Sequence, residues 1–218
     1  MQPIKNSPYI WLISGCSTGF GRELALKALS MGDFVGVSSR KVEDVEDICK
    51  QYPETSVAIT LDVTKKQEIN LAIETITKTF GGLDILVNNA GYGYLAAIEE
   101  GEDEEVRRLF ETNFFGALEL TKAALPGMRS QKFGRIINNS SQAGIMANPG
   151  TGYYSSSKFA LEGLMEALDK ELRPLNIAVT SVQPGAFRTD WSGRSMKRSN
   201  VEIDDYSQHV KELSLIHI

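Results

Sequence analysis

A tyrosine and a lysine at positions 154 and 158 are the side chains whose types and spacing most directly suggest catalysis. Within Tyr-Ser-Ser-Ser-Lys they occupy positions i and i+4, so on a helix they share one face. A phenol titrates near pH ~10, and a nearby cation lowers that pKa by favouring the phenolate. Such a tyrosine can exchange a proton with a substrate oxygen while a hydride moves to or from the adjoining carbon. Taken alone, the pair is better explained as two exposed helical residues.

Two further polar residues give the pair a context. Ser141 directly follows a β-branched segment at 135–139, where its hydroxyl could hold a substrate oxygen. Ser140 is the rival serine, and either one could instead cap a helix or a turn. Asn113 lies inside a long helical segment rich in phenylalanine, where asparagine is unfavourable and must find hydrogen-bond partners. We expect Asn113 to bridge helix and sheet, a role that is compatible with a water relay.

A glycine-rich turn at 14–21, Ser-Gly-Cys-Ser-Thr-Gly-Phe-Gly, joins the first β-branched segment to the first helix. Glycine permits positive φ and close approach of a ligand to the backbone. The free N–H groups and the dipole at the start of the next helix favour a pyrophosphate. An ordinary strand-to-helix turn is the alternative. The Gly-x3-Gly-x-Gly spacing also differs from the Gly-x-Gly-x-x-Gly fingerprint of two-domain dehydrogenases.

These residues need elements that bring them to one edge of a sheet. Short β-branched segments alternate with amphipathic ones, a pattern typical of βαβ units. Strands are expected at 9–14, 34–38, 57–61, 85–88, 135–139 and 178–183. The main helices are expected from about 19 to 31, from a Thr64–Gln67 capping box to 80, from 103 to 125 with Pro126 as its stop, and from 153 to 172. The sequence therefore predicts an α/β fold, a three-layer, doubly wound, Rossmann-like parallel sheet with its crevice at the carboxyl ends of six strands.

Composition excludes several other classes. The 218 residues are 42% apolar and 23% charged, which is ordinary for a globular protein. A net charge of -5 argues against a nucleic-acid partner and against an electrostatic membrane anchor. The apolar run 9–13 is too short for a signal core or a membrane span, and we expect Cys16 and Cys49 to be free thiols. We expect one cytoplasmic nucleotide-binding domain over 1–218, without a metal.

The motifs together make the sequence similar to the short-chain dehydrogenase/reductase family, in its compact single-domain branch, over about 9–190. The glycine turn matches, with serine at 14 where the family usually has threonine. Asn88-Asn89-Ala90-Gly91 matches a signature that supports the sheet and borders the cofactor. Asp62-Val63 resembles the adenine contact. Pro184-Gly185 with Thr189 resembles the stretch that holds the nicotinamide carboxamide.

The resemblance also implies a role for each catalytic candidate. Asn113, Ser141, Tyr154 and Lys158 fall at the positions of the family's tetrad. Tyr154 would be the general acid/base, Lys158 would lower its pKa and bind the nicotinamide ribose, Ser141 would orient the substrate oxygen, and Asn113 would position a water. Tyr153 is rejected as the rival tyrosine because its fourth neighbour is a serine. The family's spacing favours Ser141 over Ser140.

The implied cofactor is a nicotinamide dinucleotide, NADP in preference to NAD. A ribose 2′-phosphate calls for a cation at the end of the second strand, where this sequence has Ser-Ser-Arg-Lys at 38–41 and no acid before Glu43. The alternative is that Arg40 stacks on the adenine of NAD. The expected cofactor contacts are Gly15, Ser17, Thr18, Gly19, Phe20, Gly21, Arg40, Asp62, Val63, Asn89, Ala90, Gly91, Tyr154, Lys158, Pro184, Gly185 and Thr189.

The substrate is expected to be a secondary alcohol, a ketone or an aldehyde beneath a loop at about 187–201. Tyr92, Tyr94, Met146 and Trp191 could form an apolar pocket or could be ordinary packing residues. Family members usually continue past an atypical tail such as 202–218 into another helix and a seventh strand, so we expect a truncated version of a longer enzyme.

Other functions are compatible with parts of the sequence. A non-catalytic NADP-binding protein or an inactive truncated enzyme is the main alternative. A sugar-nucleotide epimerase or dehydratase would need a larger carboxyl-terminal domain, and a scaffold would have no reason to keep the tetrad. The resemblance also implies a homodimer or homotetramer assembled through the helices at 103–125 and 153–172.

Overall fold

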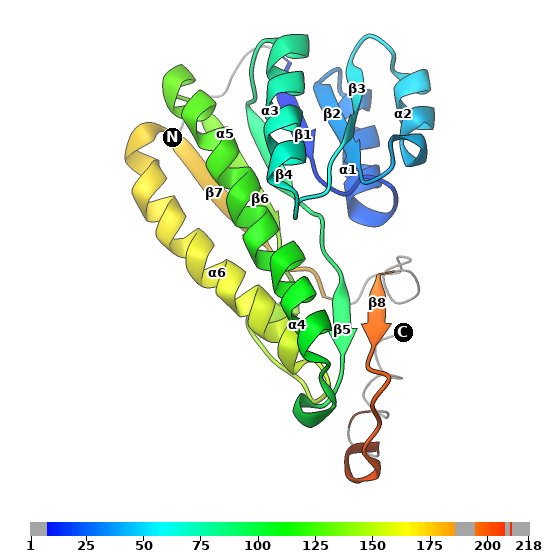
Figure 1. The fold of residues 1–218 in the computed structure, drawn as a ribbon. Helices are drawn as coiled ribbons and strands as arrows, with labels where there is room; N and C mark the ends of the chain where they lie inside the picture. The colour runs from blue at the N-terminus through cyan, green and yellow to red at the C-terminus, as the bar shows by residue number, and fades with distance from the viewer. Residues whose placement is uncertain (1–7, 186–194, 208–209, 211–218) are drawn as a thin grey trace.

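Six parallel strands form the central sheet of the computed structural model, which describes residues 8–185, 195–207 and 210. Their spatial order is β3-β2-β1-β4-β6-β7 (Figure 1). The strands are β1 (Ile10–Ile13), β2 (Phe34–Ser39), β3 (Ser56–Thr60), β4 (Ile85–Asn88), β6 (Gly134–Asn139) and β7 (Ile177–Val182). Every pair in this sheet is parallel. The predicted strands and the doubly wound α/β fold are therefore confirmed.

Helices cover both faces of the sheet. They are α1 (Gly19–Ser30), α2 (Glu46–Gln51), α3 (Lys66–Phe80), α4 (Asp103–Phe110), α5 (Ala117–Gln131) and α6 (Gly152–Leu172). One core cluster packs α3 and α5 against side chains such as Leu12 and Ile136. A second packs α1 and α2 against the opposite face, where Ile13 and Val87 point. Successive residues of β1 thus enter different cores, as expected for a parallel strand buried on both faces.

The predicted helix over 103–125 is interrupted and extended. A π-helical segment, η3 (Glu111–Gly116), separates α4 from α5. Pro126 lies inside α5 and does not end it. Proline removes one helical hydrogen bond, but the residues beyond it are held by packing, because Met128 is fully buried beneath Gly134. The helix ends at Lys132, which adopts a left-handed conformation.

The predicted capping box before α3 is also wrong. Thr64 donates its hydroxyl to Asp62 Oδ1 at 2.7 Å and does not cap the helix. Glu68 instead accepts the Asp62 N–H at 2.7 Å. A local side-chain turn thus competes successfully with the cap, as aspartate and threonine often do at such positions.

A second, two-stranded sheet lies outside the predicted elements. It pairs β5 (Gly93–Leu95) with β8 (Met196–Arg198) in parallel, with Tyr94 opposite Lys197. Short 3-10 turns complete the described chain: η1 (Val42–Asp44), η2 (Ile98–Glu100), η4 (Gln142–Gly144) and η5 (Arg173–Leu175). Three-residue strands are too short to show a periodic pattern, so sequence inspection had no signal for this pairing.

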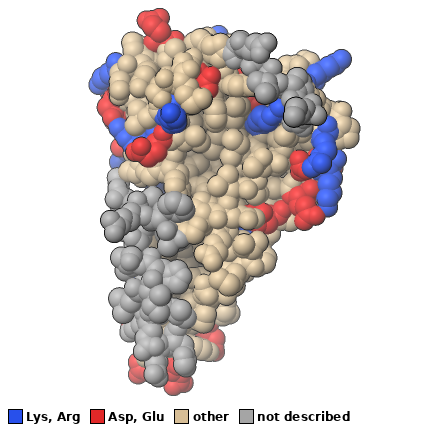
Figure 2. All heavy atoms as spheres, turned by 180° about the vertical axis from the view of Figure 1, so that it is seen from behind, with Lys and Arg blue, Asp and Glu red and all other residues tan. Residues whose placement is uncertain are grey.

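The surface carries charges of both signs. In the view from behind, Lys, Arg, Asp and Glu lie mainly around the edge and the centre is largely uncharged (Figure 2). Within the described residues, none of the helices combines the length and apolar character needed to cross a bilayer.

Candidate active site

Tyr154 and Lys158 come from the first turns of α6 and are both buried, with 8% and 5% of their surfaces exposed. The Lys158 ammonium lies 5.9 Å from the centre of the Tyr154 ring. It donates a hydrogen bond of 2.8 Å to the carbonyl of Asn139, at the carboxyl end of β6. The description of this pair as two exposed helical residues is therefore wrong. The pair sits where the helix meets the sheet edge.

Ser141 reaches the same point from the other side. It hydrogen-bonds the Tyr154 phenol, and its Oγ accepts the N–H of Ala143 at 3.1 Å. The serine therefore caps η4 and contacts the phenol at once. Ser140 is buried, and its hydroxyl has no hydrogen-bond partner in the described part of the chain. Between the two serines, only Ser141 is placed beside Tyr154.

Burial dominates the titration of both α6 residues. It raises the pKa of Tyr154, and the hydrogen bond with Ser141 opposes that rise. Burial also lowers the pKa of Lys158 to about 8, against the opposing charge of Glu162. The expected depression of the phenol pKa is therefore absent from the protein alone, because loss of water outweighs the hydrogen bond with Ser141. The tyrosine is a protonated donor at neutral pH.

Asn113 lies in the π-helical segment and is 2% exposed. Its Oδ1 accepts the N–H of Tyr92 at 3.0 Å, and its Nδ2 donates to the Tyr92 carbonyl at 2.9 Å and to Ser157 Oγ at 3.2 Å. The amide thus bridges the helix to the segment after β4 and to α6. A Cβ added to Gly91 would lie 3.1 Å from Asn113 Oδ1 and 3.7 Å from Lys158 Nζ, so this glycine lies close to both side chains.

A chain of hydrogen bonds joins the glycine turn to Lys158. The Ser14 hydroxyl accepts the N–H groups of Asn89 and Ala90 at 2.9 and 3.0 Å. Asn89 donates to the carbonyls of Ser14 and Gly15, and its Oδ1 accepts from Asn139 at 2.9 Å. Since the carbonyl of Asn139 holds Lys158, the turn and the ammonium belong to one network. Serine at 14 supplies the hydroxyl that this network needs.

The glycine turn leaves room for a phosphate. Gly15 and Gly19 have φ of +74° and +60°. A Cβ at Gly21 would collide with the Asn89 amide and the Gly15 carbonyl, whereas a Cβ at Gly19 would meet nothing within 4 Å. Thr18 makes no side-chain cap, so the first N–H groups of α1 are available to an anion. This arrangement fits the pyrophosphate of a dinucleotide, with Ser17 and the partly exposed Phe20 beside it.

The remaining expected cofactor contacts that the structure describes follow β2, β3 and β7. Arg40 is exposed at the end of β2, and its guanidinium makes no hydrogen bond or ion pair with the described residues. The side chain of Val63 packs beneath Gly116, and Asp62 precedes it. Pro184 accepts the N–H of Gln142 at 2.9 Å, which places it and Gly185 beside η4. Thr189 lies outside the described residues, as does Trp191.

The apolar side chains nearest this site differ from those expected. Tyr94 is fully buried, and the Tyr92 hydroxyl bonds to Glu105, so neither is a free pocket wall. Met146 is 49% exposed, as is suitable for a pocket lip. Ile98 and Ile145, 63% and 60% exposed, were missed. We call Ile98, Ile145 and Met146 the apolar rim. The signal that could have revealed it is an isoleucine in each of two turn-forming, polar stretches.

The rim borders the catalytic candidates. Tyr153 donates its hydroxyl to the Ile98 carbonyl at 2.6 Å, and the Ile98 side chain abuts Gly152, the first residue of α6. Ile145 and Met146 lie in the connection between Ser141 and Tyr154. Among the described residues, no group of three or more histidine, cysteine, aspartate or glutamate side chains is arranged to hold a metal ion. Cys16 and Cys49 are free thiols, as expected.

The sequence is similar to a family model and to known reductases. The family model described as short chain dehydrogenase matches residues 10–200. A 3-ketodihydrosphingosine reductase of Bacteroides thetaiotaomicron is 41% identical over 201 residues, covering 92% of this chain and 72% of the relative. An NADPH-dependent 3-dehydrocapnine reductase of Ornithobacterium rhinotracheale is 34% identical over 209 residues, covering 93% of this chain and 74% of that protein.

The fold is shared with solved structures as well. The crystal structure of a short-chain dehydrogenase from Streptomyces avermitilis superimposes with a TM-score of 0.90 at 38% sequence identity. The match covers 96% of this chain and 76% of that one.

Proposed function

The chain belongs to the short-chain dehydrogenase/reductase family, whose members act on CH–OH or carbonyl groups with a nicotinamide cofactor, and from this premise we propose that it reduces a ketone with NADPH, using Tyr154 as the proton donor. The observation that carries the proposal is the convergence of Tyr154, Ser141 and Lys158 at the carboxyl edge of the sheet, all three tied together by hydrogen bonds or close contact. The cofactor, when bound, supplies the hydride.

The protein's own residues account for the proton. The hydride adds to the carbonyl carbon and the oxygen takes a proton from the Tyr154 hydroxyl, which yields the alcohol and a phenolate. Ser141 holds the carbonyl oxygen toward the phenol. The Lys158 ammonium stabilises the phenolate as it forms. Because burial raises the pKa of Tyr154, its hydroxyl carries the proton that the reduction requires.

The preference for NADPH rests on Arg40. Its exposed guanidinium is available to a 2′-phosphate, whose two oxygens match the arginine fork. One carboxylate, Asp44, does reach the strand end, at 3.5 Å from the Ser39 hydroxyl. The NADPH-dependent relative supports the same choice.

The substrate we propose is a ketone attached to an apolar chain. The apolar rim at the mouth of the site would cover such a chain, since each buried CH₂ group contributes about 0.8 kcal/mol. The names of two relatives, a 3-ketodihydrosphingosine reductase and a 3-dehydrocapnine reductase, describe reductions of a 3-keto or 3-dehydro compound.

The test measures NADPH oxidation by the purified chain with methyl ketones of increasing alkyl length. kcat/KM should rise with chain length, and Ile98→Ser with Ile145→Ser should flatten that rise while turnover of the shortest ketone is kept. Arg40→Ala should weaken NADPH binding and leave NADH binding unchanged, with Lys41→Ala as the matched control. Tight NADPH binding without turnover of any carbonyl would support the non-catalytic alternative instead.

We further propose a homodimer or homotetramer assembled through α4, α5 and α6. Phe115 and Phe159, on this helical side of the molecule, are 43% and 46% exposed. A groove of about 390 Å³ is lined by Val106, Phe110 and Phe115. Burying such side chains against a second copy removes apolar surface from water. Light scattering during size-exclusion chromatography tests this, and Phe115→Glu should shift the chain to monomer.

A further inference from the structure

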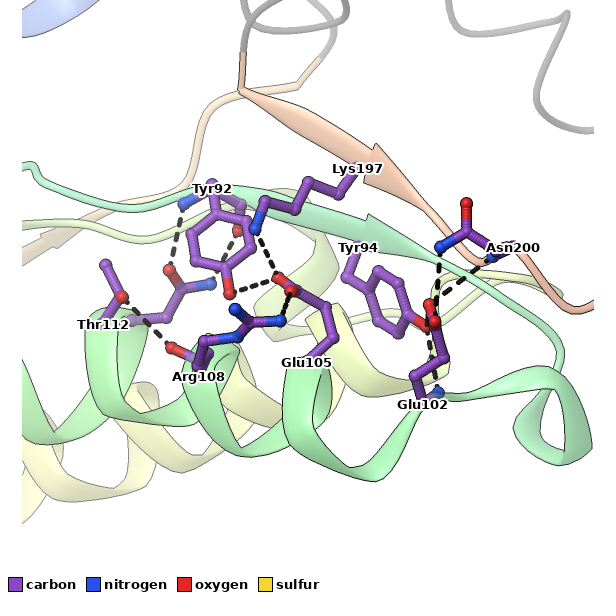
Figure 3. Close-up of polar contacts among 9 residues, drawn as sticks. Tyr92, Tyr94, Glu102, Glu105, Arg108, Thr112, Lys197 and Asn200 are labelled. Carbon is purple, nitrogen blue, oxygen red and sulfur yellow. Dashed lines mark hydrogen bonds and ion pairs between the residues drawn. The ribbon is translucent and has the colours of Figure 1, made fainter.

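Glu105 is a carboxylate that three donors surround. It lies in α4, is 6% exposed, and accepts the Tyr92 hydroxyl at 2.7 Å and the Lys197 ammonium at 2.9 Å, both on Oε1. Its other oxygen pairs with Arg108 at 2.6 Å. Figure 3 shows these side chains converging from α4, from the segment after β4 and from β8. Burying a carboxylate is costly unless it is paired in this way.

Burial and hydrogen bonding both act on the pKa values of Glu105 and Tyr92. Burial raises the pKa of Glu105, but the hydrogen bonds from Lys197 and Tyr92 outweigh it, so the pKa ends below its ordinary value. Burial, together with the bond to Glu105, raises the pKa of Tyr92, which therefore stays a donor.

The contact with Lys197 joins distant parts of the chain. Lys197 belongs to β8, which pairs with β5 so that Lys197 lies opposite Tyr94. Its ammonium also lies 5.0 Å from the centre of the Tyr92 ring. Two further carboxylates on the same side hold the chain beyond β8: Glu100 accepts the N–H of Ile203 at 2.9 Å, and Glu102 bonds Asn200 at 3.3 Å.

Tyr92 connects this cluster to the catalytic candidates. Its side chain is fixed by Glu105, and its main-chain N–H and carbonyl are both bonded to the Asn113 amide. The residue before it, Gly91, packs between Asn113 and Lys158. A movement of Tyr92 would therefore displace the Asn113 amide and the backbone beside Lys158.

We propose that Glu105 is a positioning residue, which holds the Tyr92 backbone against Asn113 and anchors β8, part of the stretch expected to cover the substrate. The inference rests on the proposed ketone reduction. Glu105 contacts none of the reacting atoms. It acts through Tyr92 on the catalytic step and through Lys197 on the segment that follows residue 195.

These two routes give different kinetic signatures. Glu105→Gln keeps the size of the side chain but removes its charge, so both routes are weakened. We expect kcat to fall at least about fivefold and KM for the ketone to rise at least about threefold, because charged hydrogen bonds are lost. Tyr92→Phe should lower kcat alone, and Lys197→Met should raise KM alone. The NADPH dissociation constant should change less than about twofold in all three.

The matched control is Glu104→Gln, since Glu104 is exposed and lines one surface groove together with Glu105 and Lys197, without bonding Tyr92 or Lys197. If Glu105→Gln behaves like Glu104→Gln in kcat and KM, or changes only the melting temperature, the proposal is overturned. Should Glu105→Gln fail to fold, Tyr92→Phe and Lys197→Met still provide the split between kcat and KM, and parallel losses in both parameters for these two variants would contradict it.

A readout without turnover separates this proposal from the proposed function. Amide hydrogen exchange at 92–95 and 196–198 should speed up at least about fivefold in Glu105→Gln and remain as in the wild type in Glu104→Gln. A wild-type chain that reduces no ketone would refute the proposed reaction, and unchanged exchange in Glu105→Gln would refute the anchor.

Discussion

The Lys158 ammonium lies 2.8 Å from the main-chain oxygen of Asn139, so the charge beside the Tyr154 ring is held by the end of a strand. That carbonyl is fixed in turn, because the Asn139 side chain donates to Asn89 at 2.9 Å. Asn89 binds the glycine turn. One network therefore sets the position of the ammonium and the shape of the turn expected to receive the pyrophosphate, which links the placement of the cofactor to the placement of the acid.

Lys158 should make stability depend on pH in a predictable window. Its pKa of about 8 in the fold is below the ordinary 10.5, so between these values the unfolded chain binds more protons than the folded one. Stability contributed by this group therefore rises with pH from about 8 to about 10.5, by roughly 3 kcal/mol. Urea unfolding of the wild type and of Lys158→Met across this pH range measures the difference between their free energies of unfolding. If that difference does not change with pH, the pKa of Lys158 is not lowered by burial.

Tyr154→Phe should greatly lower kcat and leave NADPH binding intact. Removal of a general acid typically lowers the rate about 10²–10⁴-fold, so we expect a kcat loss of this size with NADPH affinity retained. Tyr153→Phe is the matched control, because that hydroxyl bonds the Ile98 carbonyl. Its loss should lower stability by about 1 kcal/mol with kcat preserved. Equal kcat values for the two variants would exclude Tyr154 as the proton donor.

The sheet could be predicted from the sequence because parallel strands buried on both faces carry continuous β-branched runs. The segments 34–38 and 85–88 were therefore predicted as strands from their composition. Their carboxyl ends share one edge, so the sequence also predicted that Ser141, which follows a strand directly, would lie at the crevice edge. The family resemblance implied the role of each catalytic candidate, and the structure adds the contacts between their side chains.

The missed features depend on contacts between distant residues. The β5–β8 pair joins segments as far apart as Gly93 and Met196, and no local pattern encodes that partnership. The continuation of α5 through Pro126 depends on the burial of Met128. The raised pKa of Tyr154 likewise depends on how deeply α6 is buried, which spacing alone does not reveal.

Ser14→Ala should destabilise the fold more than its size suggests. Its hydroxyl accepts two main-chain N–H groups, from Asn89 and Ala90, and alanine would leave both without that partner. An unsatisfied buried donor costs about 1–3 kcal/mol, and since Asn89 and Ala90 are partly buried, we expect a total loss of about 2 kcal/mol. Ser14→Thr keeps the hydroxyl and should be near neutral. Thermal or urea unfolding measures both, and similar stabilities for the two variants would argue against the network.

Gly21→Ala should damage both the turn and the cofactor site. The new Cβ would collide with the Gly15 carbonyl and the Asn89 amide, neither of which can move without disturbing the network. Overpacking of this kind costs about 1–3 kcal/mol, and NADPH affinity should fall because the turn is displaced. Gly163→Ala is the matched control: it lies in α6, its Cβ would meet nothing within 4 Å, and alanine there should stabilise the helix by up to about 1 kcal/mol. Calorimetry measures the stability of both variants, and titration measures their affinity for NADPH. Tight NADPH binding by Gly21→Ala would contradict the prediction, because the structure leaves no space for a side chain at this position.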